Sequence, residues 1–157
     1  MAAPSPTPRV APSGIRLDDG FSTKITFATD TNIELWERTV TPPGVDGGDA
    51  IDTSTMHNSA WRTFSSRALK TLTDCTFTAA YDPAVLTPIV ALINVHTTIT
   101  VTFPDGSTWA FFGFLRQFTP GDMSEGAMPE ATVTITPTNV DSSLAEQAPV
   151  LASVAGT

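Results

Sequence analysis

Strict alternation of apolar and hydroxyl residues is the feature that most constrains the fold of this chain. Two segments, residues 98–103 and 131–136, place an apolar side chain at every second position and a threonine at each position between. Because successive side chains of a strand point to opposite faces, this period predicts strands that are buried on one face only. A chain of 157 residues built on such strands is mainly β and long enough for one domain with its own core.

Further segments extend this pattern across a predicted domain of residues 21–139. Asp105-Gly106 is a dipeptide typical of tight hairpins, so the 98–103 strand is expected to turn back into a strand over 107–118. That return strand has aromatic side chains on both faces, which predicts a central or subunit-facing position. The remaining predicted strands cover 21–28, 33–40 and 69–81, with a turn at Asp30, Thr31 and Asn32 between the first two.

One helix is predicted after these strands. Asp82 is a typical N-cap, and Pro83 suits the first helical position because its missing N–H would have no partner there. Apolar residues recur at helical spacing from Val85 to Ile93, so we expect the helix over about residues 83–94.

Three segments lack any periodic pattern. Residues 42–68 form a predicted loop with three glycines and two prolines, and loops of that length are usually functional or disordered. Residues 1–20 begin with a proline-rich stretch that favours an extended N-terminal arm, and residues 140–157 form a C-terminal tail. Neither a signal peptide nor an apolar membrane segment is expected.

Charge and cysteine content exclude several classes of function. The net charge of −8 argues against a surface that grips nucleic-acid phosphates, because such surfaces depend on Lys and Arg. Only 15% of the residues are charged, which suggests that part of the surface is buried against something else. The single Cys75 excludes an intrachain disulfide.

No catalytic, cofactor or metal site is predicted. His57 and His96 have no accompanying nucleophile motif, so an enzyme built on either of them has little support. Asp46, Asp49 and Asp52 are spaced by three, whereas a calcium loop needs ligands at alternate positions and a terminal glutamate. Nucleotide-binding glycine motifs are also missing. We therefore expect no enzyme activity and no cofactor.

Aromatic and basic residues interleave in and just after the long loop. This pattern fits a platform for single-stranded nucleic acid, or a loop that packs on a neighbouring surface with Arg62 pairing a carboxylate. The net negative charge favours the second interpretation. The subunit-interface candidates are Asp52, Met56, Trp61, Arg62, Phe64, Arg67 and Lys70.

Several short motifs occur along the predicted domain: DTSTMHNSAWRTF (52–64), LKTL (69–72), AYDP (80–83), TFPDGS (102–107), FLRQF (114–118), PG (120–121) and ATVTITPT (131–138). Together they resemble the major tail tube protein of long-tailed, siphovirus-like bacteriophages and related phage-derived tail particles. The resemblance covers roughly residues 20–140.

The resemblance implies a tail-tube-type β-sandwich or barrel with one flanking helix, and a structural rather than catalytic role. Six copies would form a ring, and stacked rings would form a hollow tube that conducts DNA during ejection. The implied partners are further copies of the chain, tape-measure, tail terminator and tail-tip proteins, and double-stranded DNA held weakly and without sequence preference. The implied location is the virion tail, assembled in the cytoplasm of a bacterial host.

The resemblance also raises the question of which residues line the bore. A negative or neutral lining would let the DNA backbone slide without sticking. The acidic candidates near predicted strands are Asp18, Asp19, Asp30, Glu34, Glu37 and Asp74. The threonine faces of the strands have two interpretations, a solvated exterior or an uncharged channel lining.

A second function remains open at this level. A monomeric β-sandwich could bind carbohydrate or protein through an exposed Trp36, Trp61 or Trp109. A stable monomer with a saturable ligand would distinguish this binding module from a self-assembling conduit.

Overall fold

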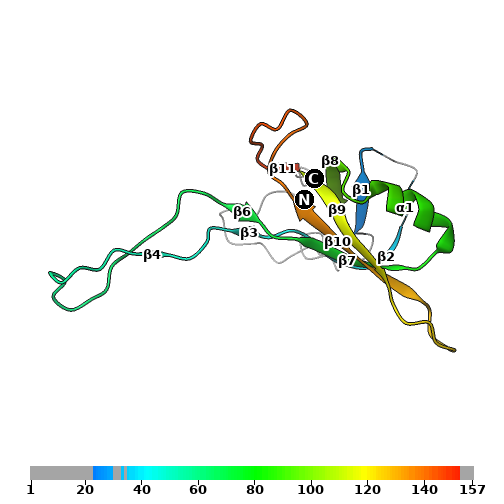
Figure 1. Ribbon diagram of the computed structural model, residues 1–157, viewed down its shortest axis with the longest axis horizontal. Helices are drawn as coiled ribbons and strands as arrows, with labels where there is room; N and C mark the ends of the chain where they lie inside the picture. Colours follow the sequence, from blue (N-terminus) through cyan, green and yellow to red (C-terminus); the bar gives the residue numbers. More distant parts are fainter. Residues whose placement is uncertain (1–22, 30–32, 34, 153–157) are drawn as a thin grey trace, which may run out of the picture.

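The computed structural model describes residues 23–29, 33 and 35–152. They form a mainly β fold, as the alternating pattern predicts: one large antiparallel sheet curls into half of a barrel, and a short helix lies beside it (Figure 1). The large sheet has the order β1-β8-β9-β10-β7-β2, and β11 also pairs with β9. Its strands are β1 (Lys24–Phe27), β2 (Trp36–Thr41), β7 (Cys75–Ala80), β8 (His96–Thr102), β9 (Thr108–Pro120), β10 (Glu130–Pro137) and β11 (Val150–Ala152).

The curl of the sheet brings its two end strands together. β1 and β2 follow one another in the sequence, yet they do not pair: β1 is hydrogen-bonded to β8, and β2 to β7. The backbone N–H of Ile25 in β1 donates to the Glu37 carboxylate in β2 at 2.9 Å, so a side chain links the two edges. The predicted turn at residues 30–32 lies outside the described residues.

One face of the curled sheet forms the core. The cross-strand pairs Ile99–Phe111 and Val133–Phe77 place apolar side chains against each other, and all four are buried. This agrees with the predicted alternation, because every second residue of β8 and β10 points inward. The hairpin at Asp105-Gly106 forms as predicted, with Gly106 at a φ of 83°.

The opposite face of the sheet is rich in threonine. The register aligns Thr78 of β7 with Thr132 of β10, and Thr132 in turn with Thr119 of β9. We call this surface the hydroxyl face. Its threonines are Thr26, Thr39, Thr41, Thr76, Thr78, Thr98, Thr100, Thr102, Thr108, Thr119, Thr132, Thr134 and Thr136.

The helix is shorter than predicted. A 3₁₀ turn, η1 (Pro83–Val85), begins with the Asp82 carboxylate accepting the Ala84 N–H at 2.9 Å, which is the predicted cap. The α-helix α1 (Leu86–Leu92) then ends because Ile93 becomes extended and forms a bridge with Leu115 of β9.

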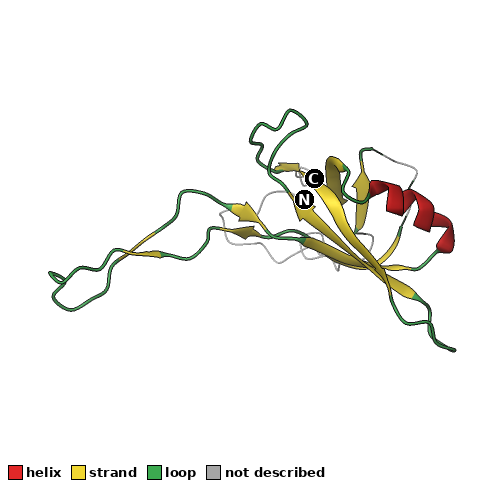
Figure 2. Cartoon of the chain, viewed as in Figure 1, coloured by secondary structure: helices red, strands yellow, loops and turns green. Residues whose placement is uncertain are grey.

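Residues 42–68 are not an irregular loop but most of a two-stranded arm that projects from the half-barrel (Figure 2). Two short ladders run along it, β3 (Val45–Asp46) with β6 (Thr71–Leu72) and β4 (Ile51–Asp52) with β5 (Phe64–Ser65). The predicted strand over 69–81 is therefore divided: β6 belongs to the arm, and only β7 belongs to the sheet. Leu69 shares the sequence parity of the buried Cys75 and Phe77, but it is 81% exposed.

The C-terminal segment returns to the sheet. β10 ends at Pro137, which leaves residues 108–110 of β9 without a neighbour on that side, and β11 pairs there instead. The predicted tail over 140–157 thus contributes a strand as far as Ala152. None of the helices among the described residues is long and apolar enough to cross a membrane.

Candidate assembly interface

The projecting arm is the most unusual surface of the molecule, and it holds all seven interface candidates. Its register pairs Ile51 with Ser65 and Asp52 with Phe64, so residues ten or more apart in the sequence lie opposite one another. Beyond β4 and β5, the Thr53 N–H donates to the Thr63 carbonyl at 2.9 Å, which continues the ladder toward the tip. The arm is held by hydrogen bonds along its length rather than by a core of its own.

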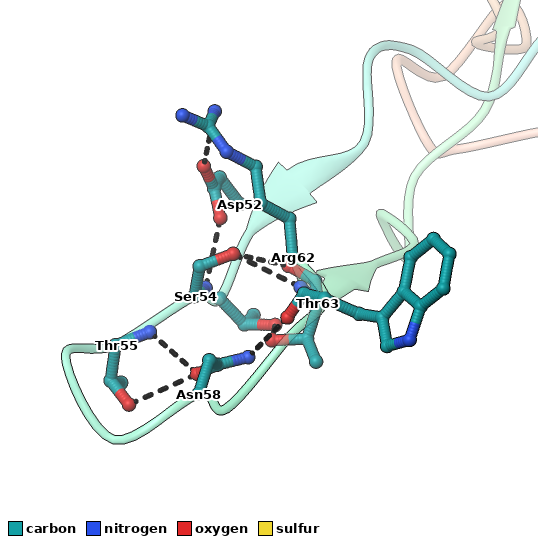
Figure 3. A network of polar contacts seen from close by, with 8 residues as sticks. Asp52, Ser54, Thr55, Asn58, Arg62 and Thr63 are labelled. Carbon is teal, nitrogen blue, oxygen red and sulfur yellow. Dashed lines mark hydrogen bonds and ion pairs between the residues drawn. The ribbon is translucent and has the colours of Figure 1, made fainter.

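Side-chain hydrogen bonds also order the tip of the arm (Figure 3). The Asn58 side chain accepts from the Thr55 N–H at 2.9 Å and donates to the Trp61 carbonyl at 2.8 Å. Ser54 donates to the Thr63 carbonyl and accepts the Thr63 N–H at 3.0 Å. These short-range bonds give the exposed tip a defined shape without apolar packing.

Asp52 and Arg62 face each other across the arm. Their charged groups are 3.8 Å apart, which is a loose, exposed ion pair (Figure 3). The Asp52 carboxylate also accepts hydrogen bonds from Ser54, and these bonds hold the pKa of the Asp52 carboxyl below its usual range. The Asp52 carboxyl therefore stays ionised at neutral pH, as the interpretation of Arg62 beside a carboxylate requires.

The apolar candidates on the arm have no cover within the described part of the chain. Trp61 is 85% exposed, Phe64 is 60% exposed, and Met56 is fully exposed at the tip. Ile51 and Val45 add exposed apolar surface on the opposite strand of the arm. Apolar groups gathered on one projecting element in this way are typical of protein–protein interaction sites.

The remaining two candidates are cations on the strand that returns from the tip. The Arg67 guanidinium donates to the Asp49 carbonyl at 2.8 Å, and Lys70 lies near the base of the arm. The tip and returning strand, residues 53–73, have three cations and no acid, whereas the outgoing strand carries Asp46, Asp49 and Asp52, so the charges of the arm balance. The arm thus combines balanced charges with exposed aromatic surface.

The acidic bore candidates fall into two groups. Asp18, Asp19, Asp30 and Glu34 lie outside the described residues. Glu37 points to the inner side of the sheet, where it accepts the Ile25 N–H. Asp74 forms an ion pair of 3.0 Å with Arg116 and accepts a hydrogen bond from Thr136.

The residues considered for chemistry are not brought together. His57 lies on the tip of the arm, and His96 packs beside the rings of Phe112 and Phe114 on the half-barrel. Cys75 is fully buried, and burial raises the pKa of its thiol to about 12. Within the described ranges, no three His, Cys, Asp or Glu side chains are grouped so as to hold a metal ion.

The sequence alone did not reveal two features of this surface. A groove of about 470 Å³ lies at the base of the arm, between Val45, Leu69 and Leu72 on one side and residues 146–149 on the other. The β9–β10 connection, residues 121–129, forms a second exposed projection. The groove joins segments about 75 residues apart, so no local pattern could have indicated it. The projection has local turn residues, Gly121, Gly126 and Pro129, and its Met123 and Met128 are exposed.

Comparisons with known proteins find matches by structure but not by sequence. No protein family model matches the chain, and no curated protein matches it. A chain in the cryo-EM structure of the anti-feeding prophage (AFP) baseplate, 6-fold symmetrised, aligns with a TM-score of 0.57 at 8% identity, over 82% of this chain and 89% of its own length. A chain of the virion of a native gene transfer agent (GTA) particle aligns with a TM-score of 0.60 at 10% identity, over 87% of this chain and all of its own length. The half-barrel with its short helix therefore shares its fold with chains of two phage-like particles.

Proposed function

We propose that this chain is a structural subunit of a phage-type tail particle, and that it builds the tube. Six copies form a ring, and rings stack into a hollow conduit through which DNA passes. The observation that carries the proposal is the arm: an ordered extension that exposes Trp61, Phe64 and Met56 on a fold shared with AFP baseplate and GTA virion chains.

The arm supports self-assembly because its exposed surface is unfavourable in an isolated subunit. A two-stranded ribbon without a core is only marginally stable in water. Burial of an exposed indole against a partner is also favourable, because it removes apolar surface from water. Aromatic residues and arginine are also the side chains that most often dominate interface energies. Packing of the arm on a neighbouring copy would bury the apolar residues and fix the ribbon.

The hydroxyl face supports a conduit for a polyanion. Its threonines carry no charge, and the cations Arg38 and Arg116 form ion pairs with Glu130 and Asp74. Lys24, which lies opposite Thr102 in the register, adds one positive charge at the edge of this face. A lining of this kind offers phosphate groups hydrogen-bonding partners but little net positive charge, so a passing duplex is held only weakly. In this proposal the hydroxyl face lines the bore, and DNA binding is weak and non-specific.

The partners and location follow from the same proposal. Each subunit contacts further copies of itself, within a ring and between rings. Terminator and tip proteins close the two ends of the tube, and a tape-measure protein occupies its bore during assembly. The chain is then a component of the virion tail, put together in the bacterial cytoplasm, and has no catalytic role.

Sedimentation velocity over a range of protein concentrations tests self-assembly directly. A subunit of 16.6 kDa that builds rings shifts to much larger species as its concentration rises. A concentration-independent monomer that saturates with a carbohydrate or peptide ligand would instead support the binding module.

A further inference from the structure

The groove at the base of the arm has the character of a binding site without an occupant. Val45, Leu69 and Leu72 give it an apolar wall on the arm side, and Lys70 adds a positive charge there. Leu69 is 81% exposed, which is unfavourable for a leucine at the mouth of an open groove. Glu146 lines the opposite wall, so the charge of the groove is polarised from one side to the other.

The loop that joins β9 to β10 has complementary chemistry. Met123 and Met128 are more than half exposed on it, and Asp122 and Glu125 are its charged residues. Its ends are fixed, because the Gly121 N–H donates to the Glu130 carbonyl at 2.7 Å. Methionine is well suited to filling an irregular apolar groove, since its side chain is unbranched and flexible.

The groove and the loop cannot meet within one molecule. Figure 1 shows the arm extending to one end of the long axis and the β9–β10 loop to the other, with the half-barrel between them. A contact between them is therefore a head-to-tail contact between two copies, and such a contact repeats without closing on the same pair. When copies follow one another along this axis, the β9–β10 loop of one copy reaches the arm base of the next copy. The arm tip of that next copy then extends past the loop and over the half-barrel of the first copy.

We propose that the groove at the arm base receives the β9–β10 loop, residues 121–129, of a second copy of this chain. Met123 and Met128 lie against Val45, Leu69 and Leu72. The acids Asp122 and Glu125 lie on the side of Lys70, and Glu146 on the far wall disfavours the reverse orientation. This inference rests on the proposed tube and names the contact by which one ring holds the next.

A charge-reversal cycle tests the orientation of the contact. The variant Asp122→Lys/Glu125→Lys is expected to raise the critical concentration for assembly about tenfold, because the attraction of both acids to Lys70 becomes a repulsion. The variant Lys70→Glu should also weaken assembly, and the combination of all three changes should restore it. If only the overall charge mattered, the variant Asp122→Lys/Glu125→Lys would lower the critical concentration instead. The variant reduces the net charge of −8 and so weakens the repulsion between subunits.

Disulfide trapping tests the contact itself. In Leu69→Cys/Met128→Cys, mild oxidation of assembled protein should produce a ladder of covalent oligomers on a non-reducing gel. The native Cys75 is fully buried and does not interfere. The matched control is Leu69→Cys/Val90→Cys, because Val90 is exposed on α1 and the proposed contact does not place it beside the groove.

The outcomes separate this inference from the tube. If the wild-type protein forms tubes, but charge reversal leaves the critical concentration unchanged and the Leu69→Cys/Met128→Cys variant yields no ladder, the groove contact is wrong and the tube stands. If the wild-type protein forms no higher assembly, both are wrong.

Discussion

Replacing Trp61 by alanine should weaken assembly while leaving the subunit folded. The side chain is 85% exposed, which corresponds to about 200 Å² of indole surface available to a partner. At about 25 cal/mol per Å², complete burial of that area is worth about 5 kcal/mol, and the cost of ordering the interface reduces this to the 2–4 kcal/mol or so typical of a dominant contact. A loss of about 2 kcal/mol raises the critical concentration for assembly roughly 30-fold.

The matched control is Trp109→Ala, because Trp109 packs against the core of the half-barrel. That change should lower the free energy of unfolding of the subunit by about 3 kcal/mol, whereas Trp61→Ala should change it by less than about 0.5 kcal/mol. Urea unfolding of dilute protein measures the first quantity, and sedimentation velocity measures the critical concentration. Equal losses of subunit stability in the two variants, or unchanged assembly in Trp61→Ala, would refute the assignment of Trp61 to an interface.

Three further predictions concern the half-barrel. Glu37→Ala removes the acceptor of a β1 amide and should lower the free energy of unfolding by about 1–2 kcal/mol, with a smaller loss in Glu37→Gln, both measured by urea unfolding. Gly113→Ala should cost about 2 kcal/mol or more in thermal unfolding, since a Cβ there lies 2.6 Å from the Thr136 carbonyl oxygen, whereas Gly47→Ala on the open arm should be nearly neutral. Burial raises the pKa of the Cys75 thiol to about 12, so the folded state keeps its proton while the unfolded thiol ionises above about pH 9. Stability is then unaffected below that pH and falls as the pH rises toward 12, by about 1 kcal/mol at pH 10 relative to Cys75→Ala, and equal alkaline profiles for the two proteins would contradict this.

The alternating strands were predictable because the period of a strand is a local property. Ile99 and Val101, like Val133 and Ile135, are all completely buried, as their spacing indicates. The Asp105-Gly106 hairpin is local for the same reason. In these segments the sequence pattern and the final environment coincide.

The arm was not predictable in detail, because it has neither a core nor a period. Its ladders are two residues long and depend on pairing between positions up to 27 apart, such as Val45 with Leu72. Leu69 follows the parity of β7, but the break at residues 73–74 separates the two segments, so the parity does not carry over. β11 was not predicted because its pairing with β9 depends on where a different strand, β10, ends at Pro137.

The composition of the segment identified the interface candidates, but it did not give their geometry. Aromatic and basic residues close together in an acidic chain indicated the arm, and the structure brings Arg62 to 3.8 Å from Asp52. The acidic bore candidates were chosen by charge, and the alternation of the threonines left two interpretations open, a solvated exterior or an uncharged channel lining. Threonine alternation gives only the face of a strand, and several strands must be aligned before the hydroxyl face is visible, with Phe112 and Phe114 of β9 among its threonines.

Electron microscopy of the purified protein tests the central claim most directly. Negatively stained samples, prepared at concentrations on both sides of the transition seen in sedimentation, should show sixfold rings that give way to hollow tubes of uniform diameter. Class averages of the rings should show the arm of each subunit against a neighbour. A uniform population of 16.6 kDa monomers at every concentration, with no rings or tubes, would contradict the account.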